Sequence, residues 1–228
     1  MTTVHFSNLS TAELADALAA PAPIAPVDTF VASKEIRRLE VGVDIDQLRS
    51  AALGLLSDEH DQGNGFHTLN VTQRPGSMVP TVEDLSGRYY MRDQHYVEQA
   101  HDPEVDETLY TELHPLVRDT YVAEVVEIMR SVAPIGRVRL LGKDPYNCNS
   151  WHRDPEPRLH IPIVASPGSL FIVNNHVTHL PADGSIYFTD TRGYHTALNG
   201  GPGSRLSLVA AIAVPPVPDT TTSSENPS

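Results

Sequence analysis

The feature that most restricts the fold of this chain is a change of hydrophobic pattern at Pro134. Beyond it, short apolar or alternating runs follow one another, separated by Gly, Pro, Asn and Asp, with no helical repeat between them. We interpret these runs as strands, and they cover residues 137–141, 158–164, 169–173, 185–189 and 205–214. Several short strands at this spacing predict an antiparallel sandwich or barrel.

Helical spacing dominates the part of the chain before Pro134. A helix is expected from Asp46, since Leu48, Ala52 and Leu55 fall on one face. A second is expected after Pro115, where apolar residues recur at helical spacing through Leu116, Val117, Tyr121, Val125 and Met129. Such periodicity indicates packing rather than catalysis. We therefore predict a mainly β fold with a helical N-terminal half and a double-stranded β-helix core, that is, a cupin-like jelly roll.

Length and composition favour one compact domain, because 228 residues with 40% hydrophobic content can build a single core. Residues 1–30 are expected to form a flexible segment, a short helix followed by a Pro/Ala linker. Residues 31–214 are the predicted catalytic domain, with 31–133 as helical and β support and 134–214 as the jelly-roll core. The Pro, Thr and Ser residues of 215–228 predict a disordered tail.

Charge and cysteine content exclude several classes of partner. The net charge of −13 opposes binding to a phosphate backbone or an anionic membrane surface. The single cysteine, Cys148, cannot form an internal disulfide, which is typical of a reducing compartment. No apolar run approaches the roughly 18 residues that a membrane span needs. We expect a soluble, cytoplasmic protein that binds neither nucleic acid nor membrane.

Two histidines and an aspartate form the first candidate site. His152 and Asp154 are two residues apart, so an extended strand would point both side chains to one face. His195 follows a later predicted strand. Two imidazoles and one carboxylate on one side of a metal leave the opposite positions open, the ligand set of iron(II) oxygenases. His176 and His179 lie in an expected loop and are assigned no ligand role.

An arginine on the last predicted strand adds to this set. Arg205 and Ser207 are two apart and share a face, and a planar guanidinium beside a hydroxyl suits a carboxylate. A buried arginine needs a partner, which a dicarboxylate cosubstrate reaching from the metal would supply. Two alternatives to a binding role stay open. Ser207 could be an ordinary barrel residue, and Arg158, on the predicted strand 158–164, could be a surface charge. His160, between Leu159 and Ile161, is expected to point inward.

The stretch from His152 to Val209 resembles the aspartyl/asparaginyl β-hydroxylase family of 2-oxoglutarate oxygenases, in the bacterial-type branch that includes free-proline hydroxylases. The resemblance covers residues 137–214. It is carried by His152-Arg153-Asp154, by Arg158 to Ile163, by Leu180 to Gly184, by His195 with Asn199, and by Arg205. Residues 1–130 show no matching motif.

This resemblance implies a role for each candidate residue. His152, Asp154 and His195 would bind iron, and Arg205, with help from Ser207, would bind the far carboxylate of 2-oxoglutarate. The segment with Arg158 and His160 would lie in the pocket, with His160 near the cosubstrate and Arg158 near a substrate carboxylate. Because halogenases of the wider superfamily lack the carboxylate ligand, Asp154 favours hydroxylation.

The expected activity is therefore that of an Fe(II)/2-oxoglutarate-dependent dioxygenase. It would use O₂ to hydroxylate a C–H bond of an amino acid or of a peptidyl or carrier-bound residue, release succinate and CO₂, and be stimulated by ascorbate. Two alternatives remain open. One is a non-catalytic jelly-roll binding or sensor module, and the other is a cupin-type enzyme without 2-oxoglutarate, in which Arg205 holds the substrate. The sequence predicts neither the substrate nor the oligomeric state.

Overall fold

The structure, a computed structural model, describes residues 8–20, 36–56, 60–77, 80–174 and 176–213. Its helices are α1 (Thr11–Ala19), α2 (Ile45–Leu55), α3 (Val82–Leu85) and α4 (Tyr121–Val132), with 3-10 turns η2 (Glu107–Leu109) and η3 (Pro115–Val117). The strands before α4 are β1 (Asn8–Leu9), β2 (Ile36–Gly42), β3 (Phe66–Asn70), β4 (Thr72–Gln73), β5 (Tyr89–Arg92), β6 (Glu98–His101) and β7 (Glu112–Leu113). Those after it are β8 (Ile135–Lys143), β9 (Asn147–Cys148), β10 (Arg158–Val164), β11 (Ser169–Val173), β12 (His176–His179), β13 (Ser185–Thr189), β14 (His195–Asn199) and β15 (Arg205–Ile212).

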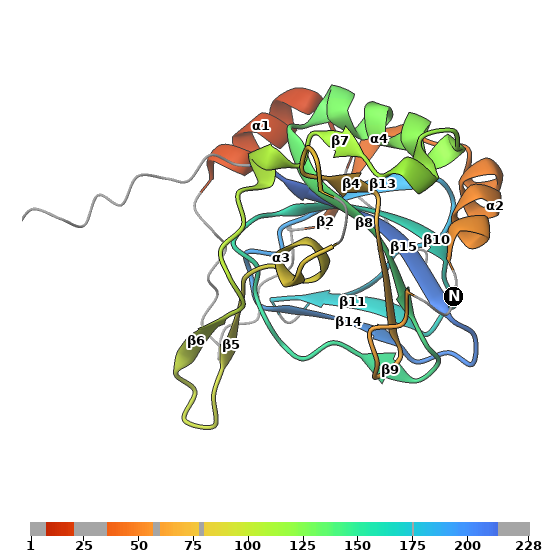
Figure 1. Cartoon of the computed structure of the whole chain (residues 1–228). Coiled ribbons are helices and arrows are strands. Elements are labelled where there is room, and N and C mark those ends of the chain that lie inside the picture. The colour runs from red at the N-terminus through yellow and green to blue at the C-terminus, as the bar shows by residue number, and fades with distance from the viewer. Residues whose placement is uncertain (1–7, 21–35, 57–59, 78–79, 175, 214–228) are drawn as a thin grey trace, which may run out of the picture.

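Two sheets form the body of the molecule (Figure 1). The larger has the strand order β1-β2-β13-β10-β15-β8-β3, and the smaller has the order β12-β11-β14-β9. From β8 to β15 the chain passes back and forth between the sheets, placing four antiparallel strands in each. This winding defines a double-stranded β-helix, or jelly roll, and confirms the predicted fold class.

The larger sheet has one apolar and one polar face, because side chains alternate along each strand. Leu140, Leu159 and Leu208 point outward and are fully buried in the main core. Helices α1, α2 and α4 cover this outer face (Figure 1). The intervening residues, such as Arg139 and His160, point inward between the sheets and line a cavity. The helical half therefore supports the jelly roll, and the polar face is left for a site.

Both predicted helices exist, but the second begins later than expected. Helix α2 begins at Ile45, where the Asp44 carboxylate caps the backbone N–H groups of Asp46 and Gln47. After Pro115 the chain makes only the turn η3, and α4 begins at Tyr121. Leu116 is 55% exposed rather than part of the core. Apolar spacing alone does not show that this stretch forms two helical segments, η3 and α4, rather than one helix.

The short helix expected within residues 1–30 is present as α1, but residues 8–20 pack against the main core and do not form a flexible segment. Strand β1 pairs in parallel with β2, and Leu9 and Leu14 are buried in the main core. Ser10 and Glu13 form a reciprocal capping box at the start of α1. The predicted linker after Ala20 and the predicted tail 215–228 lie outside the described residues. No helix in the described ranges is long and apolar enough to cross a membrane.

All five predicted strands are present, but several others were missed. Strand β12 contains His176 and His179, where a loop was expected, and β14 begins at His195 itself. Both are short and rich in polar residues, so they lack the alternation on which strand prediction depends. Strands β2 and β3 extend the larger sheet from the N-terminal half.

A buried ion pair joins the N-terminal half to the jelly roll. Arg137 on β8 is 2% exposed, and its Nη2 lies 2.5 Å from Oε1 of Glu107. The same carboxylate accepts a 2.7 Å hydrogen bond from the Arg137 backbone N–H. Gly87 has φ +77°, and a Cβ there would lie 2.1 Å from the guanidinium. The arginine therefore depends both on Glu107 for charge and on Gly87 for space.

Replacing Glu107 by alanine is expected to lower the free energy of unfolding by about 3–5 kcal/mol, because the buried Arg137 loses a carboxylate at 2.5 Å while Glu156 lies 3.6 Å away. Urea denaturation followed by circular dichroism measures this loss. A double variant, Glu107→Ala with Arg137→Leu, should be more stable than Glu107→Ala alone, since it also removes the buried positive charge that Glu107 had balanced. Wild-type stability in Glu107→Ala would show that the pair contributes nothing.

Candidate metal centre and adjoining cavity

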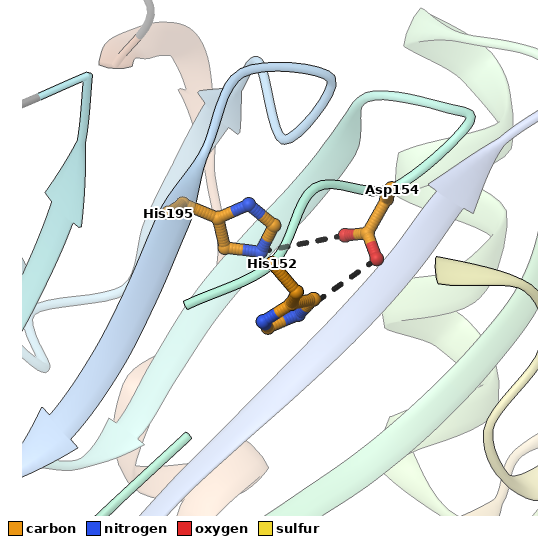
Figure 2. A group of neighbouring side chains, drawn as sticks. All are labelled: His152, Asp154 and His195. Carbon is orange, nitrogen blue, oxygen red and sulfur yellow. Dashed lines mark ion pairs between the residues drawn. The ribbon is translucent and has the colours of Figure 1, made fainter. Parts of the chain in front are cut away.

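His152, Asp154 and His195 converge at one point between the sheets (Figure 2). Nε2 of His152 lies 3.8 Å from Oδ1 of Asp154, and Nε2 of His195 lies 3.5 Å from Oδ2. Their potential ligand atoms all lie within 4.8 Å of one another. Within the described ranges, no other group of three such side chains meets this condition.

The predicted grouping is confirmed, but His152 and Asp154 do not lie on one continuous strand. They lie between β9 and β10, where His152 forms an isolated antiparallel bridge with His195 and Arg153 forms one with Tyr90. Two backbone hydrogen bonds, of 3.1 and 2.7 Å, join His152 to His195, and the Asp154 N–H donates to the Thr191 carbonyl over 2.8 Å. The segment is thus attached to the chain around β14, which brings the three ligands together.

Backbone carbonyls fix the orientation of both imidazoles. Nδ1 of His152 lies 2.7 Å from the Ser150 carbonyl, and Nδ1 of His195 lies 3.0 Å from the Gly193 carbonyl. Because a carbonyl only accepts hydrogen bonds, each Nδ1 carries the hydrogen, which leaves each Nε2 as the nitrogen that would bind a metal. Burial lowers the pKa of His195 to about 3, so this imidazole is neutral.

Asp154 supplies the negative charge of the site. It is 1% exposed, and its Oδ2 has no hydrogen-bond partner among the described residues. Burial favours the neutral acid, but the charge of the Arg158 guanidinium holds the Asp154 pKa below its ordinary value. Two imidazole nitrogens and one ionised carboxylate oxygen fit a divalent transition metal such as iron(II).

A cavity of about 630 Å³ opens beside this group. Its lining includes six of the seven predicted site residues, namely His152, Asp154, Arg158, His160, Arg205 and Ser207. Neither ring nitrogen of His160 has a hydrogen-bond partner among the described residues, and the same holds for Oγ of Ser207. Buried polar atoms normally have partners, so these atoms indicate a polar ligand.

Arg205 lies in the same cavity and is 7% exposed. Its Nη1 donates to the backbone carbonyls of Leu170 at 3.1 Å and Leu198 at 3.2 Å. Burial lowers its pKa to about 10, so it is charged at neutral pH. Among the described residues no carboxylate pairs with it, which leaves a buried charge available to an anionic ligand.

Arg158 lines the cavity, as expected, and also contacts the carboxylate of the group. Its Nη2 lies 2.9 Å from Oδ1 of Asp154 and 3.4 Å from Oε1 of Glu156. The alternative of a surface charge is wrong, since the residue is only 9% exposed. Because its guanidinium already pairs with the carboxylate ligand, it holds Asp154 in place whatever else it contacts.

Arg158→Ala is therefore expected to weaken iron(II) binding by about 10–100-fold, the usual effect of removing a partner of a metal ligand. Anaerobic titration with iron(II) measures this. Arg158→Lys serves as the comparison, since it keeps the charge but not the planar fork. Iron affinity equal to that of wild type in Arg158→Ala would show that Asp154 does not depend on this contact.

Sequence reasoning missed two basic residues of the cavity, Arg139 and Lys143 on β8. Arg139 is 4% exposed, and its Nη1 donates to the carbonyls of Leu85 and Ser86. Burial and the nearby charges of Arg137 and Arg158 lower its pKa to about 9. The sequence does contain a signal for them. Arg139 and Lys143 are four residues apart on a strand with several apolar residues, so their side chains share one face.

No protein-family model and no curated protein sequence matches this chain. Similar solved structures include an oxidoreductase of the 2OG-Fe(II) oxygenase family from Burkholderia pseudomallei, with 14% identity, a TM-score of 0.46, and coverage of 91% of this chain and 95% of that chain. Another is the viral collagen prolyl hydroxylase of Paramecium Bursaria Chlorella virus-1, solved as a 2OG complex, with 12% identity, a TM-score of 0.44, and coverage of 80% and 98%. AviO1 from Streptomyces viridochromogenes Tue57 has 17% identity, a TM-score of 0.44, and coverage of 81% and 91%. At such low identities and TM-scores these likenesses identify no activity, so function has to be inferred from the site of this chain.

Proposed function

We propose that this protein is an iron(II)- and 2-oxoglutarate-dependent dioxygenase that hydroxylates a C–H bond. The observation that carries the proposal is a group of two imidazoles and one ionised carboxylate, with Asp154 and His195 buried, beside a cavity that holds an arginine without a carboxylate partner among the described residues. The reaction balances as substrate, 2-oxoglutarate and O₂ giving hydroxylated substrate, succinate and CO₂. Bound iron(II) would supply the activation of O₂.

In this proposal His152, Asp154 and His195 hold the metal, and three ligands leave positions for the cosubstrate and O₂. The carbonyls of Ser150 and Gly193 keep both Nε2 atoms available as ligands. The site excludes bulk water, since Asp154 and His195 are almost fully buried. Such exclusion protects a reactive centre from side reactions.

Arg205 is the proposed partner of the far carboxylate of 2-oxoglutarate, because this buried cation donates to backbone carbonyls of the smaller sheet and has no carboxylate partner among the described residues. Ser207 lies two residues further along β15, on the same face, with its hydroxyl unpartnered among the described residues. His160 faces the same cavity from β10 as a neutral imidazole, because burial and the charges of Arg158 and Arg205 hold its pKa well below its ordinary value. Both residues can donate a hydrogen bond to a bound carboxylate.

The proposed substrate is an amino acid, or a peptidyl or carrier-bound residue, with an anionic group. The motif segments from His152 to Arg205 support placing the chain in the bacterial-type branch of the aspartyl/asparaginyl β-hydroxylase family. The positive charge of the cavity supports an anionic substrate. Arg139 lines the cavity without a carboxylate partner among the described residues, and Arg158 lines the same cavity. The net charge of −13 and the single cysteine favour a cytoplasmic enzyme that does not act on nucleic acid.

Succinate release tests this proposal directly. The protein is incubated with iron(II), ascorbate, O₂ and 2-oxoglutarate, with a panel of free amino acids, peptides and carrier-bound residues. We expect at least one compound to raise succinate release and to gain one oxygen atom, with neither effect in His152→Ala. If one compound is oxidised while 2-oxoglutarate is not consumed, a cupin-type enzyme without this cosubstrate is the better assignment. Binding without any turnover would favour a sensor module.

A further inference from the structure

A second cation lies beside Arg205. Lys143, the last residue of β8, is paired directly with Arg205 on β15. Directly opposed residues on neighbouring strands point to the same face, with Cβ atoms about 4.5–5.5 Å apart. Both side chains line the cavity, and they are 6% and 7% exposed. Neither has a carboxylate partner within the described ranges, so two cations share one end of the cavity.

The hydrogen bonds of Lys143 leave one donor free only when the amine is charged. Its Nζ donates to the Ala197 carbonyl over 2.8 Å and to Oδ1 of Asn149. An ammonium group has three N–H donors, so one remains for a ligand. A neutral amine has two hydrogens, both used by these oxygens, and would direct its lone pair into the cavity. Only the protonated form can therefore donate to a bound carboxylate.

We infer that Lys143 is a second contact, with Arg205, for the far carboxylate of 2-oxoglutarate, and that binding of the cosubstrate is accompanied by uptake of one proton on this amine. The proton comes from solvent, and no covalent bond forms or breaks. This inference rests on the proposed function, because it assumes that 2-oxoglutarate is the ligand.

The surroundings of Lys143 explain why its protonation should depend on the ligand. Burial and the charge of Arg205 lower the Lys143 pKa to about 7, with a small opposing effect from Cys148. The Phe66 ring of β3 lies 4.7 Å from Nζ, and the nearby Asp144 pairs with His67 instead. A bound carboxylate would be the first close negative partner and would raise this pKa.

The sign of the pH effect follows. Below pH 7 the free protein already carries the proton, and 2-oxoglutarate binds without proton uptake. Between pH 7 and the higher pKa of the complex, binding requires a proton from solvent. The affinity for 2-oxoglutarate should therefore fall as pH rises above 7, by up to about tenfold per pH unit.

Anaerobic titration of the iron(II) protein with 2-oxoglutarate from pH 6 to 9 tests this. Wild type should lose affinity above pH 7 as described. Lys143→Arg should bind with little pH dependence, because its charge does not titrate in this range. Lys143→Met should bind at least about tenfold more weakly than wild type at pH 6.5, which is the expected cost of losing a charged donor, with a similarly flat pH profile.

Proton uptake can also be observed at the residue itself. The sequence contains two lysines, Lys34 and Lys143, so a protein labelled with ¹³C at lysine Cε gives two signals that Lys34→Arg assigns. With zinc(II) as a diamagnetic substitute, 2-oxoglutarate should raise the pKa of the Lys143 signal by more than one pH unit and leave that of Lys34 unchanged. This measurement remains decisive if Lys143→Met does not fold.

The outcomes separate the two proposals. If 2-oxoglutarate binds wild type equally well from pH 6 to 9 and its binding leaves the Lys143 signal unchanged, the inference about Lys143 is wrong and the proposed function stands. If 2-oxoglutarate does not bind to wild type with metal at any pH, both the inference and the proposed function are wrong.

Discussion

Replacing His195 by alanine is expected to abolish iron(II) binding at micromolar concentrations and with it all turnover. The structure leaves no substitute ligand, because the three side chains form the one such group in the described residues. Loss of a direct ligand should cost more than the about 10–100-fold that loss of an outer partner causes. Anaerobic iron titration and succinate release measure the two effects separately.

His95→Ala provides the matched control. His95 is exposed on the loop between β5 and β6, where its backbone N–H donates to Asp93. This variant loses one histidine from the chain but none from the metal centre, and it should bind iron as wild type does. If His195→Ala retained wild-type iron affinity, His195 would not be a ligand, and the assignment of the metal centre would be wrong.

Arg205→Met is expected to lower the affinity for 2-oxoglutarate by tens- to thousands-fold. A charge-assisted pair in a desolvated cavity is lost, and leaving the carboxylate unpaired costs about 2–5 kcal/mol. Iron binding should stay near normal, because Nη1 of Arg205 contacts the carbonyls of Leu170 and Leu198 and no metal ligand. Separate anaerobic titrations with iron(II) and with 2-oxoglutarate measure both constants.

Arg205→Lys distinguishes charge from geometry in this prediction. It keeps a cation in the cavity but loses the planar fork, so its affinity for 2-oxoglutarate should lie between those of wild type and Arg205→Met. Unchanged cosubstrate affinity in Arg205→Met together with a collapse of iron affinity would instead make Arg205 a structural residue. The assignment of 2-oxoglutarate would then lose its main support.

The sequence predicted the parts of the fold that have strong periodicity. Apolar strands such as 158–164 were found with the bounds that the structure shows, since alternation and flanking turn residues mark them. Strands β12 and β14 were missed because they are short and rich in polar residues, and both are held by pairing with β11, β12 as the next strand of a hairpin and β14 from further along the chain. The burial of Leu9 and Leu14 likewise depends on packing partners that lie far along the chain.

The candidate site was predicted in its ligands but not in its surroundings. His152, Asp154 and His195 could be grouped because few residue types bind metals, so chemistry limits the choice. The contact between Arg158 and Asp154 depends on the conformation of the short segment that joins them, and the burial of Arg139 depends on the neighbours of β8, so neither could be predicted. The pairing of Lys143 with Arg205 is a fact of strand register, which the sequence of either strand alone does not contain.

Anaerobic visible spectroscopy of the wild-type protein with iron(II) and 2-oxoglutarate tests the central claim most directly. Chelation of iron(II) by a 2-oxo acid gives a weak charge-transfer band that neither component gives alone with the protein. We predict that this band forms with one equivalent each of iron(II) and 2-oxoglutarate, and that it is absent in His195→Ala. Absence of the band in wild type, or an unchanged band in His195→Ala, would contradict an iron(II)/2-oxoglutarate site built on His152, Asp154 and His195.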